Sequence, residues 1–149
     1  MTARLNPIVA QTALHQQMQQ WRRDLHKHPE TAYEEFRTCA VVEQKLQDWG
    51  LTVHSGLGGT GLVAVLPGKY PGDKHIGLRA DMDALPMHES NTFAHAACHH
   101  GKMHGCGHDG HTTMLLGAAH YLAQNPEFAG TVYFIFQPAE EGGAGANRM

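Results

Sequence analysis

The stretch Thr131-Val-Tyr-Phe-Ile-Phe-Gln-Pro-Ala-Glu-Glu-Gly-Gly143 joins a β-branched and aromatic run to a polar, glycine-rich end. Such a run is typical of a strand that is covered on both faces. Glu140 and Glu141 then lie just beyond the carboxyl end of that strand. Open α/β sheets bind ligands in the crevice at this end of their strands. The stretch therefore predicts a strand that brings two carboxylates to one edge of a sheet.

Working outward, the chain alternates between strand-like and helix-like segments. A second acidic pair, Asp81 and Asp83, follows a short predicted strand at 75–80. The remaining predictions are helices over 8–28, 31–49 and 109–124 and strands over 51–56 and 62–66. Thr31 with Glu34 forms the pattern of a capping box for the second helix, and Asp109 is the expected N-cap of the third. The alternation predicts an α/β fold, with a mostly parallel mixed sheet flanked by helices.

Composition excludes several classes of function. The 149 residues contain 11 Lys and Arg against 14 Asp and Glu, so there is no basic excess with which to bind nucleic acid electrostatically. The longest apolar runs, such as residues 62–66, are far shorter than the roughly 20 residues that span a bilayer, so we expect no membrane partner. Three cysteines, an odd number, argue against a disulfide framework and favour a reducing, cytoplasmic location.

Histidine is abundant, and it concentrates around one cysteine. Of 13 histidines, eight fall between His88 and His120. Cys106 and His108 flank a single glycine, so in an extended segment their side chains project the same way and can bind one ion or two adjacent ions. His111 is a candidate partner of such a ligand. The alternative to a metal site is a purely structural role, with a buried cysteine among surface histidines.

The two acidic pairs allow a functional and a plain interpretation. Asp81 and Asp83 either bind metal, hold a ligating imidazole through its second nitrogen, or form an ordinary turn at a strand end. Adjacent carboxylates point in different directions, so one of Glu140 and Glu141 can bind metal while the other acts as a general base toward water. Alternatively, both belong to a solvated helix start.

Four ordered segments resemble the M20 metallopeptidase family: 26–30, 79–86, 104–111 and 137–142. The resemblance is strongest to its amidohydrolase branch, which contains hippurate hydrolases, N-acyl-L-amino-acid amidohydrolases and auxin-conjugate hydrolases. It implies two divalent ions, of zinc, manganese, nickel or cobalt. The implied metal ligands are Cys106, His108 and Glu141, with Glu140 as general base, Asp83 as an orienting carboxylate and Asp81 as its neighbour.

The resemblance also implies a function and a domain organisation. We expect metal-dependent hydrolysis of the amide bond of N-acyl amino acids, which are small-molecule substrates. Residues 1–149 would be the N-terminal part of a catalytic domain, without two further histidine ligands and without the dimerising lid domain of a homo-oligomeric enzyme. One alternative is a truncated, non-catalytic metal-binding fragment. A less favoured alternative is a hydrolase that uses Cys106 as its nucleophile with a histidine base.

Overall fold

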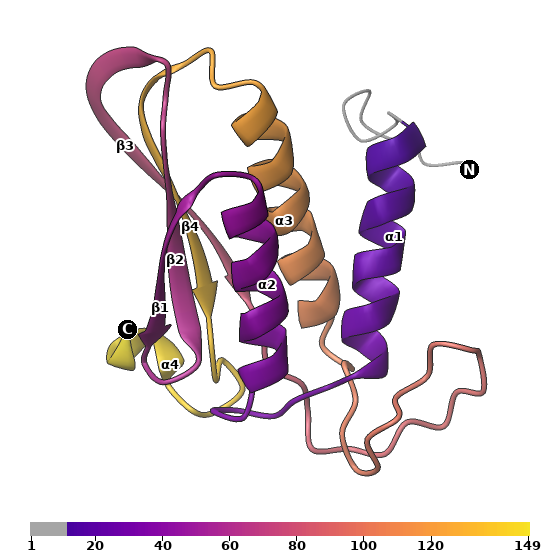
Figure 1. The fold of residues 1–149 in the computed structure, drawn as a ribbon. Helices are drawn as coiled ribbons and strands as arrows, with labels where there is room; N and C mark the ends of the chain where they lie inside the picture. The colour runs from indigo at the N-terminus through magenta and orange to yellow at the C-terminus, as the bar shows by residue number, and fades with distance from the viewer. Residues whose placement is uncertain (1–11) are drawn as a thin grey trace, which may run out of the picture.

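The computed structural model describes residues 12–149, which form a four-stranded sheet with a layer of helices on one face (Figure 1). Helices α2 and α3 pack on the sheet, and α1 packs against α3. In chain order the elements are α1 (Thr12–Lys27), α2 (Phe36–Asp48), β1 (Thr52–Leu57), β2 (Gly61–Pro67), β3 (Tyr70–Asp81), α3 (His108–Gln124), β4 (Ala129–Gln137) and α4 (Gly145–Arg148).

The sheet has the strand order β1-β2-β4-β3 and is mixed. β3 and β4 pair in parallel, whereas β1 with β2 and β2 with β4 pair antiparallel. The α/β class with a mixed sheet is confirmed, but one parallel pair of three is fewer than expected for these residues. The turn between β1 and β2 occupies only residues 58–60, which is too short for the crossover that parallel strands need.

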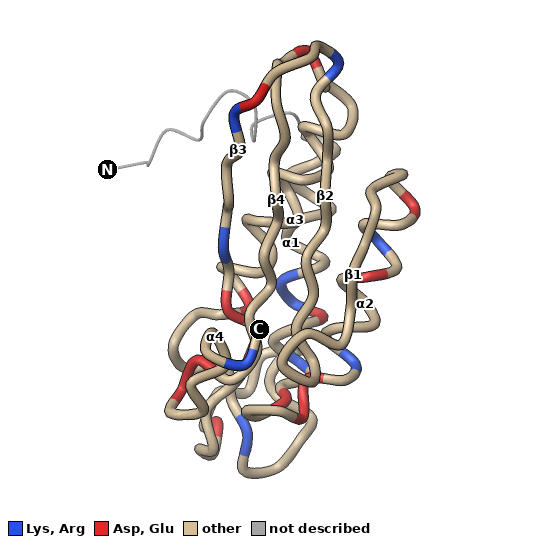
Figure 2. Tube along the Cα trace, turned by 90° about the vertical axis from the view of Figure 1, so that its left-hand side faces the viewer, with Lys and Arg blue, Asp and Glu red and all other residues tan. Residues whose placement is uncertain are grey.

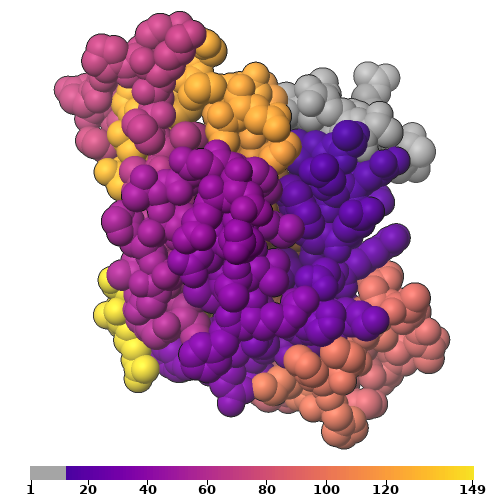
Figure 3. Space-filling model, in the orientation of Figure 1, coloured from indigo at the N-terminus to yellow at the C-terminus, as the bar shows by residue number. Residues whose placement is uncertain are grey.

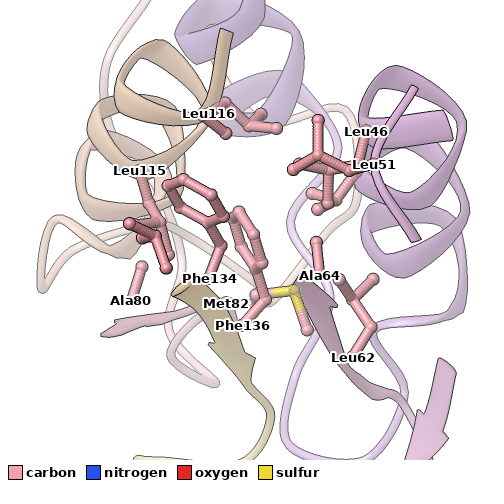
Figure 4. Packing of buried hydrophobic residues seen from close by; sticks show 13 residues of the cluster. Leu46, Leu51, Leu62, Ala64, Ala80, Met82, Leu115, Leu116, Phe134 and Phe136 are labelled. Carbon is pink, nitrogen blue, oxygen red and sulfur yellow. The ribbon is translucent and has the colours of Figure 1, made fainter. Parts of the chain in front are cut away.

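The core lies between the sheet and helices α2 and α3 (Figure 4). Along β4, Val132, Phe134 and Phe136 are buried, whereas Tyr133 and Ile135 on the opposite face are only half-buried. Within residues 12–149 the helices therefore cover one face of β4, not both as its sequence suggested. Burying a large apolar side chain contributes about 1.5–3 kcal/mol, so Phe134 and Phe136 anchor this strand under the helices.

The start of α2 differs from the prediction. Thr31 and Glu34 do interact, with the Thr31 hydroxyl donating to the Glu34 carboxylate over 2.8 Å, but the helix begins only at Phe36. The reason is that Thr31 bridges to Ala84 beside the end of β3, which holds it in extended backbone. The first turn of the helix is capped by Glu30 instead, whose carboxylate accepts the backbone N–H of Thr38 over 2.7 Å.

The start of α3 also differs, while the ends of α1 and α3 are close to those predicted. Asp109 is not the N-cap, because the helix begins at His108 after Gly107, whose φ of 96° places it in the left-handed region. α3 ends at Gln124, and α1 ends at Lys27, two residues before Pro29. The predicted start of the first helix, at residues 8–11, lies outside the described residues. From residue 12 onward, no helix has the length and apolarity to cross a membrane.

Candidate metal centre

Both acidic pairs lie at the same edge of the sheet. β3 and β4 run in parallel, and Asp81 pairs in register with Gln137 at the last position of each strand. The chain then delivers Asp83 after one strand and Glu140 and Glu141 after the other. Figure 2 shows acidic positions gathered at this end of the molecule, near α4. The sequence-based prediction that the two pairs share one edge is therefore met.

Three of the predicted side chains bring metal-binding atoms together. A sulfur of Cys106, a ring nitrogen of His108 and a carboxylate oxygen of Glu141 all lie within 4.8 Å of one another. His108 Nε2 is 3.8 Å from Glu141 Oε1. The segment from Cys106 to His108 is not extended, because Gly107 turns the chain into α3. The turn, and not strand alternation, puts the two side chains on the same side.

The tautomer of His108 follows from its neighbours. Its Nδ1 lies 2.8 Å from the carbonyl oxygen of Asp83 and 3.2 Å from Asp83 Oδ1. Because a carbonyl oxygen only accepts hydrogen bonds, Nδ1 carries the proton and donates it. Nε2 is left with a free lone pair that faces Cys106 and Glu141. This arrangement, with one nitrogen anchored and the other free, is the usual one for a metal-binding histidine.

Asp83 holds two of the candidate ligands. Besides receiving His108 through Oδ1, it accepts the backbone N–H of Glu141 at Oδ2 over 2.9 Å. Asp83 is fully buried, so its carboxylate is rigidly placed between the end of β3 and the segment after β4. These contacts fit an orienting role for Asp83.

Asp81 and His111 form a second group beside the first. His111 Nδ1 is 2.7 Å from Asp81 Oδ1, and Arg79 Nη1 donates to Asp81 Oδ2 over 2.7 Å. Burial alone would raise the pKa of Asp81, but the hydrogen bond from His111 and the positive charges nearby lower it. Asp81, His108 and His111 also place ligand atoms within 4.8 Å of one another. The sequence offered His111 only as a candidate partner of a ligand and Asp81 only as a neighbour of Asp83, and the structure places both beside His108.

Glu140 lies beside these groups without belonging to either. Its Oε2 is 3.8 Å from His108 Nε2, and its side chain is 42% exposed. Within residues 12–149, no hydrogen bond from a side chain or backbone group engages its carboxylate. The carboxylate is therefore accessible to solvent next to the candidate ligands.

The charges of the site fit a cation. Four carboxylates and a thiol lie beside two imidazoles, those of His108 and His111, and in the described part of the chain the only Lys or Arg paired with these carboxylates is Arg79. Hydrogen bonding to Glu141 and the nearby negative charges raise the pKa of the Cys106 thiol. A divalent ion would offset the mutual repulsion of these negatively charged groups. Mixed sulfur, nitrogen and oxygen donors suit zinc and also accept manganese, nickel or cobalt.

Comparison with known proteins shows which family the chain resembles. Residues 77–149 match the model of peptidase family M20/M25/M40. The hippurate hydrolase of Campylobacter jejuni is 48% identical over 128 residues, which are 86% of this chain and 33% of that protein. The N-acyl-L-amino acid amidohydrolase of Geobacillus stearothermophilus is 47% identical over 122 residues, covering 81% of this chain and 33% of that protein. From residue 77 onward, the chain matches the M20 family.

A solved structure supports the same assignment. A Bacillus subtilis protein described as a dinuclear metal-binding peptidase of the M20 family superposes with a TM-score of 0.87 at 39% identity. The match covers 93% of this chain and 39% of the other. The chain thus spans about a third of the length of the curated relatives it matches.

Two buried carboxylates whose roles sequence reasoning missed contact or adjoin segments next to the candidate metal centre. Glu35 is fully buried, and its Oε1 accepts the backbone N–H of Ala139 over 2.8 Å, which fixes the residue before Glu140. Asp109 directly follows His108, and its Oδ2 is 2.9 Å from His26 Nδ1. An acidic residue at the start of a helix reads as a cap or a solvated residue, so only the three-dimensional contacts reveal these roles.

Proposed function

We propose that this chain is the N-terminal part of a catalytic domain that hydrolyses the amide bond of N-acyl amino acids with divalent metal ions. The observation that carries the proposal is the convergence of Cys106, His108 Nε2 and Glu141, with the other His108 nitrogen held by Asp83. The names of the relatives, a hippurate hydrolase and an N-acyl-L-amino acid amidohydrolase, support the substrate class.

The roles follow from what each side chain contacts. Cys106, His108 and Glu141 would hold an ion, and Asp83 would keep His108 and the Glu141 backbone in place. The chemistry that bound divalent ions supply is Lewis acidity toward a carbonyl and a lowered pKa of water. Glu140, accessible and not engaged by hydrogen bonds within residues 12–149, would take the proton of the attacking water and return it to the leaving amine.

The proposal also covers the remaining metal ligands, a further domain and the cellular location of the protein. Completing a dinuclear centre would need two histidines from outside these 149 residues, together with a lid domain through which the enzyme dimerises. The three cysteines are free thiols, which supports a reducing, cytoplasmic location. By itself the chain would have little or no amidase activity, because it would hold at least one ion with too few ligands.

The test is hydrolysis of hippurate and N-acetyl amino acids by a full-length protein that carries this sequence, with zinc, manganese, nickel or cobalt added. We expect activity that a chelator abolishes and the metal restores. Activity that survives complete metal removal would instead favour Cys106 as a nucleophile. The same assay is applied to the 149-residue chain alone. Robust turnover by this chain that Glu140→Gln abolishes would show that no metal ligands from outside these residues are needed.

A further inference from the structure

The loop that leads to Cys106 is closed at its base by a pair of backbone hydrogen bonds. The Leu85 N–H donates to the Met103 carbonyl over 2.9 Å, and the Met103 N–H donates to the Leu85 carbonyl over 3.0 Å. The two arms of the loop therefore start out antiparallel. In the space-filling view the loop protrudes beyond the lower end of α1 (Figure 3).

Two histidines occupy equivalent positions on the two arms. His88 follows Leu85 by three residues, and His100 precedes Met103 by three residues. Their ring centres are 4.9 Å apart, and the ring planes are inclined by 52°. Both side chains are exposed, and within residues 12–149 no hydrogen bond engages either ring. All four ring nitrogens are thus unengaged, whereas His108 at the candidate metal centre is anchored through Nδ1.

The distance between the His88 and His100 ring centres matches that of two imidazoles bound to one ion. With metal–nitrogen bonds of about 2.0–2.1 Å, two imidazoles bound at neighbouring positions of an ion have ring centres roughly 4.5–5.2 Å apart. The two ring planes are inclined by 52°, so the rings are not stacked in parallel. We propose that His88 and His100 form an accessory site for a transition-metal ion such as Zn²⁺, Ni²⁺ or Cu²⁺, for which imidazole is a favoured ligand.

The accessory site differs from the candidate metal centre in its donors. No third Cys, His, Asp or Glu in the described part of the chain joins this pair within 4.8 Å. Two protein ligands leave the remaining positions of the ion to water, so the ion is held less tightly and exchanges readily. The loop does lie close to the turn of Cys106, because a Cβ on Gly105 would come within 2.9 Å of the Met87 sulfur. The site is independent of the function proposed above.

The test is a Zn²⁺ titration of the protein followed by the NMR signals of the histidine rings. We expect the His88 and His100 rings to respond together in one binding step. His88→Gln and His100→Gln should each weaken that step by at least about tenfold, since the second imidazole acts at high effective concentration. His54→Gln, which removes an exposed histidine on β1, is the matched control and should leave the step unchanged.

Cys106→Ser separates this site from the candidate metal centre. The step assigned to His88 and His100 should persist in that variant. The proposal is overturned if either glutamine variant retains the step at full strength, if the two rings respond in separate steps, or if Cys106→Ser abolishes the step.

Discussion

His108 begins α3, and His26 contacts Asp109 in the first turn of the same helix. The ring nitrogens of the two histidines have opposite kinds of environment. His108 is anchored through Nδ1 alone, and its Nε2 faces a thiol and carboxylates. His26 has both nitrogens engaged, with Nδ1 2.9 Å from Asp109 Oδ2 and Nε2 3.0 Å from Glu89 Oε1. Because ionised carboxylates only accept hydrogen bonds, His26 must carry two protons. The partners of each ring nitrogen therefore separate a candidate metal ligand, His108, from a structural cation, His26.

The largest effect is expected on the His108 side, in a full-length protein that carries this sequence. Glu140→Gln should lower the rate of amide hydrolysis by about 10²–10⁴-fold, because it removes a general base, while leaving the bound metal in place. Glu141→Gln should instead lose metal. Both are measured by steady-state kinetics and by metal analysis of the same samples. If Glu141→Gln kept its full metal content and lost only rate, the two roles would be reversed.

On the His26 side the effect should appear in stability. His26→Ala leaves Asp109 and Glu89, both buried, without their shared cation. Breaking a buried charge pair typically costs about 3–5 kcal/mol, and we expect a loss of this size in the free energy of unfolding. Urea denaturation measures it, with His54→Ala as an exposed control. A loss no greater than that of the control would mean that His26 is not the cation that this cluster needs.

The same cluster predicts a dependence of stability on pH. Burial opposes the charge of His26, but its hydrogen bonds with Glu89 and Asp109 raise its pKa above 6.5. The folded state therefore binds the proton more tightly than the unfolded state does. The stabilisation is fully present below about pH 6.5 and is lost as the pH rises through the raised pKa.

Thermal unfolding of the wild type and His26→Gln between about pH 6 and 9 measures this dependence. The wild-type advantage should shrink as the pH rises. Glu89 stays ionised throughout, because hydrogen bonds from Ala97, Asn91 and His26 outweigh burial and hold its pKa at about 2. The groups next to His26 also include Asp109, His95 and His104, and Arg22 pairs with Asp109. A constant difference between the two proteins would rule out His26 as the titrating group.

The smallest effect on stability is expected at Arg22, which contacts the same Asp109 carboxylate as His26. Arg22 Nε also contacts Asp109 Oδ2, at 3.3 Å, but the Arg22 side chain is 60% exposed. Exposed ion pairs contribute about 0–1 kcal/mol, so Arg22→Met should cost no more than that in urea denaturation. A cost equal to that of His26→Ala would show that Arg22 supplies the charge that we assign to His26.

Much of the fold was predictable because its signals are local. The run 131–136 predicted β4, and the acidic pairs at 81–83 and 140–141 predicted the edge where the candidate site lies. The starts of α2 and α3 were not predictable in the same way. Thr31 and Asp109 each have the local pattern of a helix cap. In the structure, however, Thr31 bridges to Ala84 and the Asp109 carboxylate contacts His26, both distant in sequence.

The candidate site shows the same division between local and distant signals. Cys106 and His108 stand out by their spacing in the sequence, and the structure brings them together with Glu141. Glu35 and Glu89 carry no pattern that separates them from surface glutamates. Their roles depend on contacts with Ala139 and His26, which are 104 and 63 residues away in sequence. Only the packed structure supplies those contacts.

The most direct test of the candidate metal centre is cobalt binding by the wild type, Cys106→Ser and Cys98→Ser. Cys98 is the matched control, because it is also an exposed, free thiol. Cobalt content is measured together with the thiolate-to-cobalt charge-transfer absorption. We predict that Cys106→Ser loses one ion per chain and the absorption band, whereas Cys98→Ser keeps both. Equal cobalt content and an unchanged band in Cys106→Ser and the wild type would contradict the metal centre proposed for Cys106, His108 and Glu141.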